Sequence, residues 1–346
     1  MDSLSQIVLG AAVGEVMLGS RLGNRAMLLG AIGGTIPDLD ILLNPLVQDE
    51  LQRLRIHRGY SHSMFVHILL ALPFAWLSFK WCRDKVTFGR MYLAWYLMFL
   101  THTLLDCCTT YGTQLFLPFT DYLVGFNNIS VVDPFWTIPF MLLLVVCMFM
   151  RRDNPRRLRW AWIAISWQFV YMGYTLINKY HVDQEFRVTL DYEQILYDEL
   201  YTTPSIFNNW LWAGIAVSKD SIWFGEYSTL QSSPYVDWAS YPRNTDLVKN
   251  HPARESVEIL EWFSQGKYLA RQRGDTLDFF VAKWGRMDFT RTEPEEAFRF
   301  YYQVYPDGNG GWKSHPVEPE FGEAEFKEAW TRLWRRALGY DAPQAP

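Results

Sequence analysis

Cysteine is scarce in this chain of 346 residues, which contains four. All of them lie in apolar segments of the first half: Cys82, Cys107, Cys108 and Cys147. No pair has the CxxC spacing of a redox or zinc motif, and neighbouring Cys107 and Cys108 would form a strained disulfide. The simplest interpretation is that these cysteines are small buried hydrophobic residues, which argues against a disulfide scaffold.

Two further features are missing. No basic stripe and no nucleic-acid-binding motif stands out, so we set nucleic acid aside as a partner. Residues 1–20 also lack the basic start of a secretory signal peptide, because Asp2 stands where Lys or Arg would be expected. We therefore interpret this first apolar segment as part of the mature protein.

The two halves of the chain differ in composition. Residues 1–177 hold nearly all the long apolar runs and carry 14 Lys/Arg against 11 Asp/Glu. Residues 178–346 carry 18 Lys/Arg against 26 Asp/Glu. An apolar, basic half followed by a polar, acidic half predicts an α-helical membrane domain at 1–177 and a soluble domain at 178–346.

Six segments of the first half are long and apolar enough to be candidate membrane helices, given a hydrocarbon core about 30 Å thick. They are residues 4–20, 26–43, 63–80, 90–108, 131–150 and 160–177. The first two are short and rich in glycine. Because small residues let helices approach closely, this pair is expected either to pack tightly or to be re-entrant.

Positive charges in the connecting segments predict the orientation. The segments at 21–25, 80–90 and 151–159 carry eleven Lys/Arg, whereas those at 44–62 and 109–130 carry three. The richer set is expected in the cytoplasm. Both termini and the whole of 178–346 would then be extracytoplasmic, on a multi-pass membrane protein.

The second half shows short alternating runs that are typical of strands. We predict strands at 185–190, 210–217, 221–227, 277–284 and 298–305. Amphipathic helices are expected at 253–270 and 322–337. This mixture predicts an α+β fold for the soluble domain.

Ionisable residues inside membrane segments are costly, so each needs a reason. The predicted topology brings most of them to the outer membrane face, and we take them as candidate metal ligands: Asp38, Asp40, His57, His62, His102, Asp106 and Asp133. Glu15 lies deep in the first segment and would join them only if that segment is re-entrant; otherwise it would pair internally.

His102 and Asp106 are the clearest pair, because a spacing of four places both on one helical face. Imidazole and carboxylate ligands together suit zinc or manganese. Each residue also has a simpler interpretation, such as a helix cap, a headgroup contact or an interhelical hydrogen bond. His67 faces an apolar run and is interpreted as a packing histidine.

Several motifs occur in one order: MDSLSQIVLGAAVGEVMLG, GAIGGTIPDLD, HRGYSHS, HTLLDCCTTYGTQ and VVDPFWTIP. In these motifs the chain resembles the LexA-regulated, membrane-bound metal-dependent hydrolases, the YdjM-like family. The stretch PSIFNNWLW (204–212) is similar to an element of one subgroup. Gln6 departs from the pattern, because many members carry His there, and Glu15 is expected to compensate.

The resemblance implies a distant similarity to zinc-dependent phospholipase C and to single-strand nucleases. It implies His57, His62, His102, Asp106, Asp38 and Asp40 as ligands. We expect metal-assisted hydrolysis, in which Asp38 or Asp40 ligates the metal or acts as general base and Arg58 holds a phosphate oxyanion. A site at the membrane face favours a lipid or lipid-linked ester, with phosphoesters before amides and other esters.

Two other classes of function stay open. A transporter or ion channel would use paired His and Asp as a pathway, and its ionisable groups would be distributed through the membrane depth. A non-catalytic scaffold would hold a structural metal in a closed coordination sphere and bind a partner through its outer domain. The concentration of ionisable groups at one face favours the enzyme.

Overall fold

The computed structural model describes residues 1–47, 49–82, 84–286, 293–298, 300–317 and 322–343. The chain divides into two compact units. The first, which we call the helical unit, comprises residues 1–46 and 56–176. The second, the sheet unit, comprises residues 47–55 and 177–346. The assignment of residues 1–177 to a membrane domain and of residues 178–346 to a soluble domain stays a prediction.

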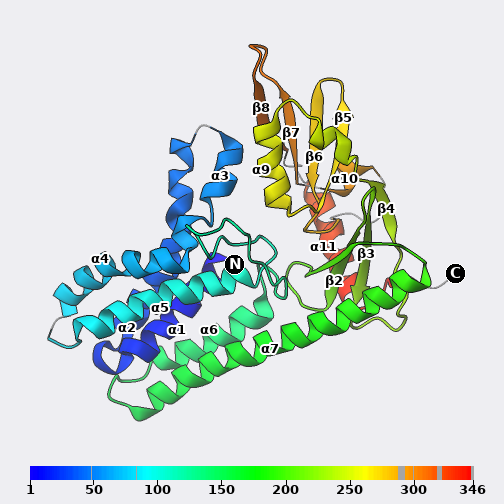
Figure 1. Ribbon diagram of the computed structural model, residues 1–346. Helices are drawn as coiled ribbons and strands as arrows, with labels where there is room; N and C mark the ends of the chain where they lie inside the picture. The colour runs from blue at the N-terminus through cyan, green and yellow to red at the C-terminus, as the bar shows by residue number, and fades with distance from the viewer. Residues whose placement is uncertain (48, 83, 287–292, 299, 318–321, 344–346) are drawn as a thin grey trace. The chain divides into compact units, whose positions relative to one another are not determined.

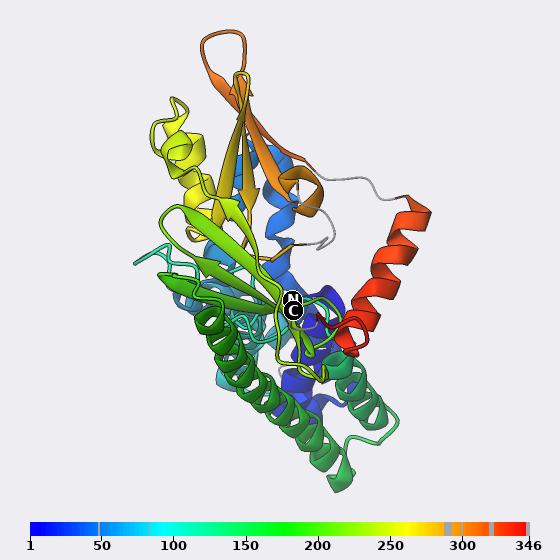
Figure 2. The same ribbon diagram turned by 90° about the vertical axis from the view of Figure 1, so that its right-hand side faces the viewer.

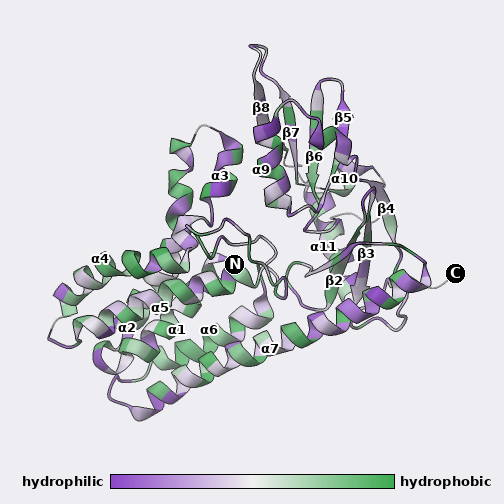
Figure 3. Ribbon diagram, viewed as in Figure 1, coloured by the Kyte–Doolittle hydropathy of each residue, from purple (hydrophilic) through white to green (hydrophobic). Residues whose placement is uncertain are grey.

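The helical unit holds every apolar segment predicted from the sequence, each of them as a helix (Figure 1). Its elements are α1 (Ser3–Leu22), α2 (Asn24–Thr35), the 3-10 helices η1 (Ile36–Leu46) and η2 (Tyr60–His62), α4 (Met64–Cys82), α5 (Phe88–Cys107), α6 (Pro134–Met148) and the first part of α7 (Pro155–Tyr192). Figure 3 shows hydrophobic residues concentrated on these helices.

Among the described residues, three segments are long and apolar enough to cross a membrane: Ser3–Leu22, Asn24–Leu46 and Met64–Cys82. The first two are the glycine-rich pair. Helix α6 is apolar but shorter, at 15 residues. That all six apolar segments cross the membrane therefore stays a prediction.

Helices α1 and α2 pack closely through glycine, as their composition predicts. A Cβ atom on Gly10 would lie 2.1 Å from the carbonyl oxygen of Gly30, and one on Gly34 would lie 2.2 Å from that of Gln6. No side chain fits at such distances, so the two backbones are in direct contact. This contact places the end of α2, from which η1 continues, beside Gln6 near the start of α1.

The sheet unit contains two antiparallel four-stranded sheets, and each joins its strands in sequence order. The first sheet consists of β1 (Glu199–Pro204), β2 (Leu211–Val217), β3 (Ser221–Ser228) and β4 (Ala239–Pro242). The second consists of β5 (Tyr268–Arg273), β6 (Thr276–Val281), β7 (Tyr301–Pro306) and β8 (Trp312–Val317). The helices of this unit are α8 (Thr245–Lys249), α9 (Arg254–Ser264), α10 (Pro294–Ala297) and α11 (Glu323–Ala337), with α3 (Glu50–Ile56) at the boundary between the units.

The two sheets share one core, in which Phe224 of the first sheet and Phe280 of the second both lie beside Phe298. Helix α9 contacts β6 of the second sheet (Figures 1 and 2). The first sheet also packs on the end of α7, where the ring of Phe186 lies so close to Gly214 that a Cβ there would be 2.7 Å away.

One prediction for this unit is wrong, and a second extends too far along the chain. The segment 185–190 belongs to α7 rather than to a strand, because its apolar face at Phe186 is buried against β2 at helical spacing. The helix predicted at 253–270 ends at Ser264, where Gln265 and Gly266 both adopt positive φ and the chain turns into β5. Arg299 of the predicted strand 298–305 lies outside the described residues.

Candidate metal centre

Four side chains of the helical unit converge on one point. Asp38 comes from η1, His62 ends η2, and His102 and Asp106 lie one turn apart on α5. The Nε2 atoms of the two histidines are 3.2 Å apart. Asp106 Oδ2 lies 3.1 Å from His62 Nε2 and 3.6 Å from His102 Nε2, and Asp38 Oδ1 is 3.4 Å from each ring.

These spacings and donor types fit a metal ion. Four N and O ligands that each lie 2.0–2.1 Å from a tetrahedral zinc ion are separated by about 3.3 Å. Five of the six separations between the donor atoms are 3.1–3.6 Å and match that value, and the sixth, between oxygens of Asp38 and Asp106, is within 4.8 Å. The side chains of His62, His102 and Asp106 are fully buried, whereas that of Asp38 is 24% exposed. The cluster therefore reaches the surface of the protein at Asp38.

Hydrogen bonds behind the two imidazoles fix their orientation. His102 Nδ1 lies 2.7 Å from the carbonyl oxygen of Gly34, to which it donates. His62 Nδ1 lies 2.9 Å from Ser61 Oγ, whose own proton is donated to Asp40 Oδ2 over 2.7 Å. With Nδ1 protonated, each ring presents the lone pair of Nε2 to the cluster, as a metal ligand must.

Asp40 builds the turn that carries His62. Its Oδ2 also accepts a hydrogen bond of 2.9 Å from the backbone N–H of Arg58, a residue with a φ of 57°. Non-glycine residues rarely adopt this conformation, and the carboxylate helps to hold it. Asp40 Oδ1 lies 3.0 Å from His57 Nδ1. The structure therefore places Asp40 behind the cluster, outside the four converging donors.

His57 is also not one of the converging ligands. Its ring contacts Asp40 through Nδ1 and the ring of Tyr111 edge to face, with centroids 5.3 Å apart. The side chain is 27% exposed. His57 thus forms a pair with Asp40 beside the cluster, because the turn at 57–62 directs His62 inward and His57 outward.

Arg58 lies against the cluster in a buried position. Its Nε is 3.4 Å from Asp106 Oδ2, its Nη1 donates to Thr109 Oγ1, and its guanidinium lies 4.7 Å from the ring centre of Tyr111. The positive charge therefore partly offsets the carboxylate of Asp106. Whether it also contacts a substrate stays a prediction.

Two residues near the chain start contact the other oxygen of Asp106. Gln6 Nε2 donates to Oδ1 over 2.9 Å and to the carbonyl oxygen of His102 over 3.2 Å, and the amino nitrogen of Met1 also contacts Oδ1. The departure at Gln6 from the expected His thus leaves a side chain that still supports the cluster. These long-range contacts have no signal in local sequence.

Glu15, predicted as a further ligand, is not one of the four converging residues. Both of its oxygens pair with the guanidinium of Arg157, at 2.6 and 2.7 Å, in a buried ion pair. Arg157 also donates to Asn24 Oδ1 and to the carbonyl oxygen of Met150. Nine residues of α1 separate Glu15 from Gln6, which is about 13 Å along the helix.

Asp133 is the remaining predicted ligand that lies elsewhere. It caps α6, where its carboxylate accepts hydrogen bonds from the backbone of Phe135 and Trp136 and from the hydroxyl of Tyr171. Pro134 follows at the first helical position, as its sequence context predicts. With three hydrogen-bond donors, this carboxylate stabilises the start of the helix, and it is not one of the four converging donors.

The charge balance favours a cation at the cluster. Burial alone would lower the pKa of His62, but the neighbouring carboxylates of Asp106 and Asp38 raise it above its ordinary value. The two buried or half-buried carboxylates thus attract positive charge to the point where the donors meet. His67, interpreted as a packing residue, donates from Nε2 to the carbonyl oxygen of Ser61 over 2.8 Å and lies outside the cluster.

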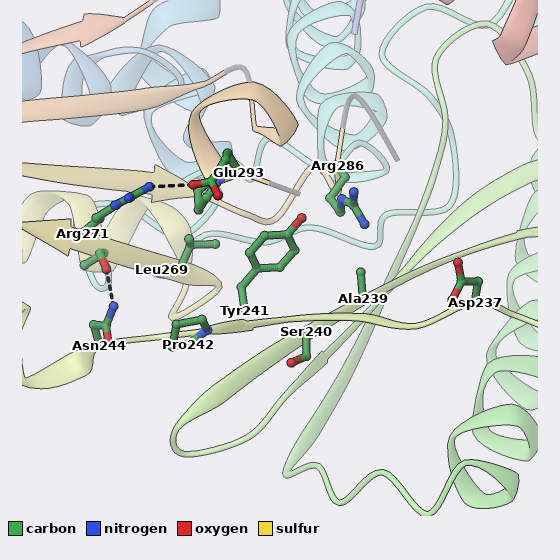
Figure 4. Close-up of a pocket in the computed structure, with 12 residues that line it drawn as sticks. Asp237, Ala239, Ser240, Tyr241, Pro242, Asn244, Leu269, Arg271, Arg286 and Glu293 are labelled. Carbon is green, nitrogen blue, oxygen red and sulfur yellow. Dashed lines mark hydrogen bonds and ion pairs between the residues drawn. The ribbon is translucent and has the colours of Figure 1, made fainter. Parts of the chain in front are cut away.

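The sheet unit has a separate cavity of about 520 Å³, shown in Figure 4. Tyr241 projects into it beside Arg286, and Arg271 on its rim is paired with Glu293. The metal-ligand group described above lies in the helical unit and shares no residue with this cavity. The chemistry predicted from the sequence therefore belongs to the cluster.

Comparison with known proteins identifies the helical half. A family model described as "YdjM inner membrane protein" matches residues 1–182. A protein of Bacillus subtilis (strain 168), named "Uncharacterized protein YfhP", is 22% identical over 207 residues, which cover 58% of the chain and 59% of that protein. No solved structure matches the chain. The expected likeness to phospholipase C and nucleases stays an expectation.

Proposed function

Because the chain belongs to the YdjM inner membrane protein family, we propose that it is a membrane-bound, metal-dependent hydrolase. Its centre would be the cluster of Asp38, His62, His102 and Asp106. The observation that carries the proposal is the convergence of four donor atoms within 4.8 Å of one another, with both imidazoles oriented from behind.

Zinc is the preferred cofactor, with manganese as the alternative. Two imidazoles and two carboxylates suit both ions, and a set of only four protein donors suits zinc better. When bound, such a metal polarises the scissile group and lowers the pKa of a water molecule so that hydroxide is available near neutral pH.

The residues of the chain would divide the remaining work. His62, His102 and Asp106 hold the metal, since they are buried and fixed. Asp38 is the ligand nearest to solvent, so it is the carboxylate best placed to accept a proton from an attacking water. Arg58, paired with Asp106, is close enough to the cluster to stabilise negative charge on a phosphoester.

The membrane setting suggests the substrate. All the ligands lie in or beside the candidate spans at 24–46 and 64–82 or on α5. A lipid or lipid-linked ester, in particular a phosphoester, would reach such a site without leaving the bilayer. We further propose that all six apolar helices cross the inner membrane and that residues 178–346 are extracytoplasmic, because Lys and Arg are concentrated in the loops on the other side.

A transporter is the main rival. It would need a series of ionisable groups through the membrane depth, and Glu15 was the one candidate predicted to lie away from the outer membrane face. Its bidentate pairing with Arg157 gives it a structural role instead. A scaffold with a structural metal would fill its coordination sphere with all four donors. The hydrolase instead requires a position for water, either because the partly exposed Asp38 acts as base rather than as ligand or because the metal takes a fifth ligand.

The proposal is tested by metal analysis of the detergent-purified protein together with a hydrolysis screen of phospholipids, lipid-linked phosphates and lipid esters. We expect close to one equivalent of zinc or manganese, and turnover that stops on chelation and returns on adding the metal. A protein with full metal content and no turnover on any of these substrates would favour the scaffold.

A further inference from the structure

The loop between α5 and α6 exposes aromatic side chains beside the metal centre. In residues 115–126, LFLPFTDYLVGF, the exposed fractions are 38% for Phe116, 76% for Phe119, 64% for Tyr122 and 55% for Phe126. Four large aromatic side chains within eleven residues are therefore exposed. Such a patch is typical of a surface that binds a partner. We call this segment the aromatic loop.

The aromatic loop is fixed to the first turn of α4, a candidate membrane span. The backbone N–H of Met64 donates to the carbonyl oxygen of Leu115 over 3.1 Å, and Ser63 Oγ donates to that of Leu117 over 2.5 Å. The rings of Phe65 and Phe119 meet edge to face, with centroids 4.9 Å apart. The loop therefore lies at the end of that span.

Its apolar surface continues the exposed face of α4. Phe65, Ile68, Leu69 and Leu72 are 37–68% exposed and recur at helical spacing, so they form the face that a membrane span turns to lipid. Phe119 extends this face through its contact with Phe65. A surface continuous with the lipid-facing side of a span is itself expected to meet lipid.

The base of the loop is attached to the metal centre. The backbone N–H of Gln114 donates to the carbonyl oxygen of Arg58 over 3.1 Å, and that of Phe126 donates to Cys107, next to the ligand Asp106, over 2.7 Å. The loop thus joins the two segments that carry Arg58 and Asp106. Whatever the loop contacts is close to the cluster.

The composition of the loop favours the boundary between lipid and water. Residues 109–130 contain no Lys or Arg and one acidic residue, Asp121. Phe and Tyr together, with few charges, are typical of the interfacial layer, where the apolar rings enter the acyl region and the polar groups remain hydrated.

We propose that the aromatic loop is inserted into the interfacial layer of the bilayer and guides lipid molecules sideways to the metal centre. Only the guiding role rests on the proposed hydrolase function, because insertion of the loop does not depend on hydrolysis. The occupant of this surface is phospholipid, because the patch is continuous with a lipid-facing helix rather than isolated on a water-facing surface.

Insertion is tested with a nitroxide spin label on Phe119→Cys in the full chain, reconstituted in nanodiscs of anionic and zwitterionic phospholipid. Accessibility to oxygen, which partitions into lipid, is compared with accessibility to a water-soluble nickel complex. Leu69→Cys on α4 is the lipid-facing control, and Asn309→Cys in the turn after β7 is the water-facing control. The wild-type chain, labelled under the same conditions, gives the background from its own cysteines.

We expect Phe119→Cys to behave like Leu69→Cys, with an oxygen-to-nickel ratio several-fold above that of Asn309→Cys. A ratio like that of Asn309→Cys would overturn the proposal, and so would low accessibility to both probes, which would indicate coverage by protein such as a second copy. Tyr122→Cys is the second position, in case the first variant does not fold.

The guiding role is tested with Phe119→Ser and Tyr122→Ser. Both are expected to retain full metal content and to lose several-fold in turnover of bilayer-embedded substrate, but not of a short-chain soluble one. Equal loss on both substrates would reject guidance. If the wild-type chain shows no turnover at all, the proposed function fails while the spin-label result still decides insertion.

Discussion

His62 Nε2 and His102 Nε2 lie 3.2 Å apart, although 40 residues separate them in the chain. Each ring is held from behind, one by Ser61 and the other by the carbonyl oxygen of Gly34. Two imidazole lone pairs directed at one point repel each other unless a proton or a cation lies between them. The positions of these two rings are therefore the strongest structural indication of a metal site.

Replacing His102 by Ala should abolish metal binding, whereas His57→Ala should leave most of it, because His57 faces Asp40 rather than the cluster. Metal per mole of purified protein, measured by mass spectrometry, separates the two. Equal loss in both variants would show that His57 is a ligand after all. Unchanged monodispersity in detergent is the control for folding.

Ser61→Ala should weaken metal binding by about 10–100-fold, the usual effect of removing an outer hydrogen bond to a ligating histidine. The hydroxyl links His62 to Asp40, so its loss frees the ring to rotate. Ser63→Ala is the matched control, because that hydroxyl faces the carbonyl oxygen of Leu117. Titration with a competing chelator gives both affinities, and similar values would contradict the orienting role.

Glu15→Gln should destabilise the helical unit by roughly 3–5 kcal/mol, because it leaves the Arg157 charge buried without its partner. Metal content should not change. Thermal unfolding in detergent measures the loss, and the double variant Glu15→Leu with Arg157→Leu should recover much of it. A variant that keeps its stability but loses metal would restore Glu15 to the list of ligands.

Gly30→Ala should cost about 1–3 kcal/mol or more, since the added methyl would lie 2.1 Å from the carbonyl oxygen of Gly10 and force α1 from α2. Gly173→Ala on α7 is the control, because nothing lies within 4 Å of a Cβ there. That change should be neutral or stabilise the helix by up to about 1 kcal/mol. Comparable melting temperatures for the two variants would contradict the tight packing.

A tag at the C-terminus should be reached by a membrane-impermeant label in intact spheroplasts, and a cysteine placed in the loop at 151–159 should not. The reason is the excess of Lys and Arg in that loop and its equivalents. A protected C-terminal tag would reverse the orientation and place the metal centre at the cytoplasmic face. Labelling after lysis controls for the reactivity of both sites.

The sequence predicted the positions of the apolar helices and the close approach of α1 and α2, because both follow from local composition. Apolar length determines where a helix can span, and glycine at positions such as Gly10 and Gly30 determines where two backbones can touch. The pairing of His102 with Asp106 was equally local, since residues four apart on a helix share one face. In the sheet unit, the segment at 185–190 was wrongly predicted as a strand, because a short apolar run fits either a strand or a buried helix face.

The tertiary structure alone decided which of the candidate residues meet. Glu15, Asp133, Asp40 and His62 are all buried ionisable groups by sequence pattern, and nothing in their spacing separates a ligand from a helix cap or an ion-pair partner. Arg157 reaches Glu15 across 142 residues, and Asp40 organises a turn 18 residues away. Such contacts depend on how the helices pack, which is a property of the whole chain. The sequence therefore determined the chemistry available at the membrane, and the packing of α1, η1 and α5 determined which side chains converge to use it.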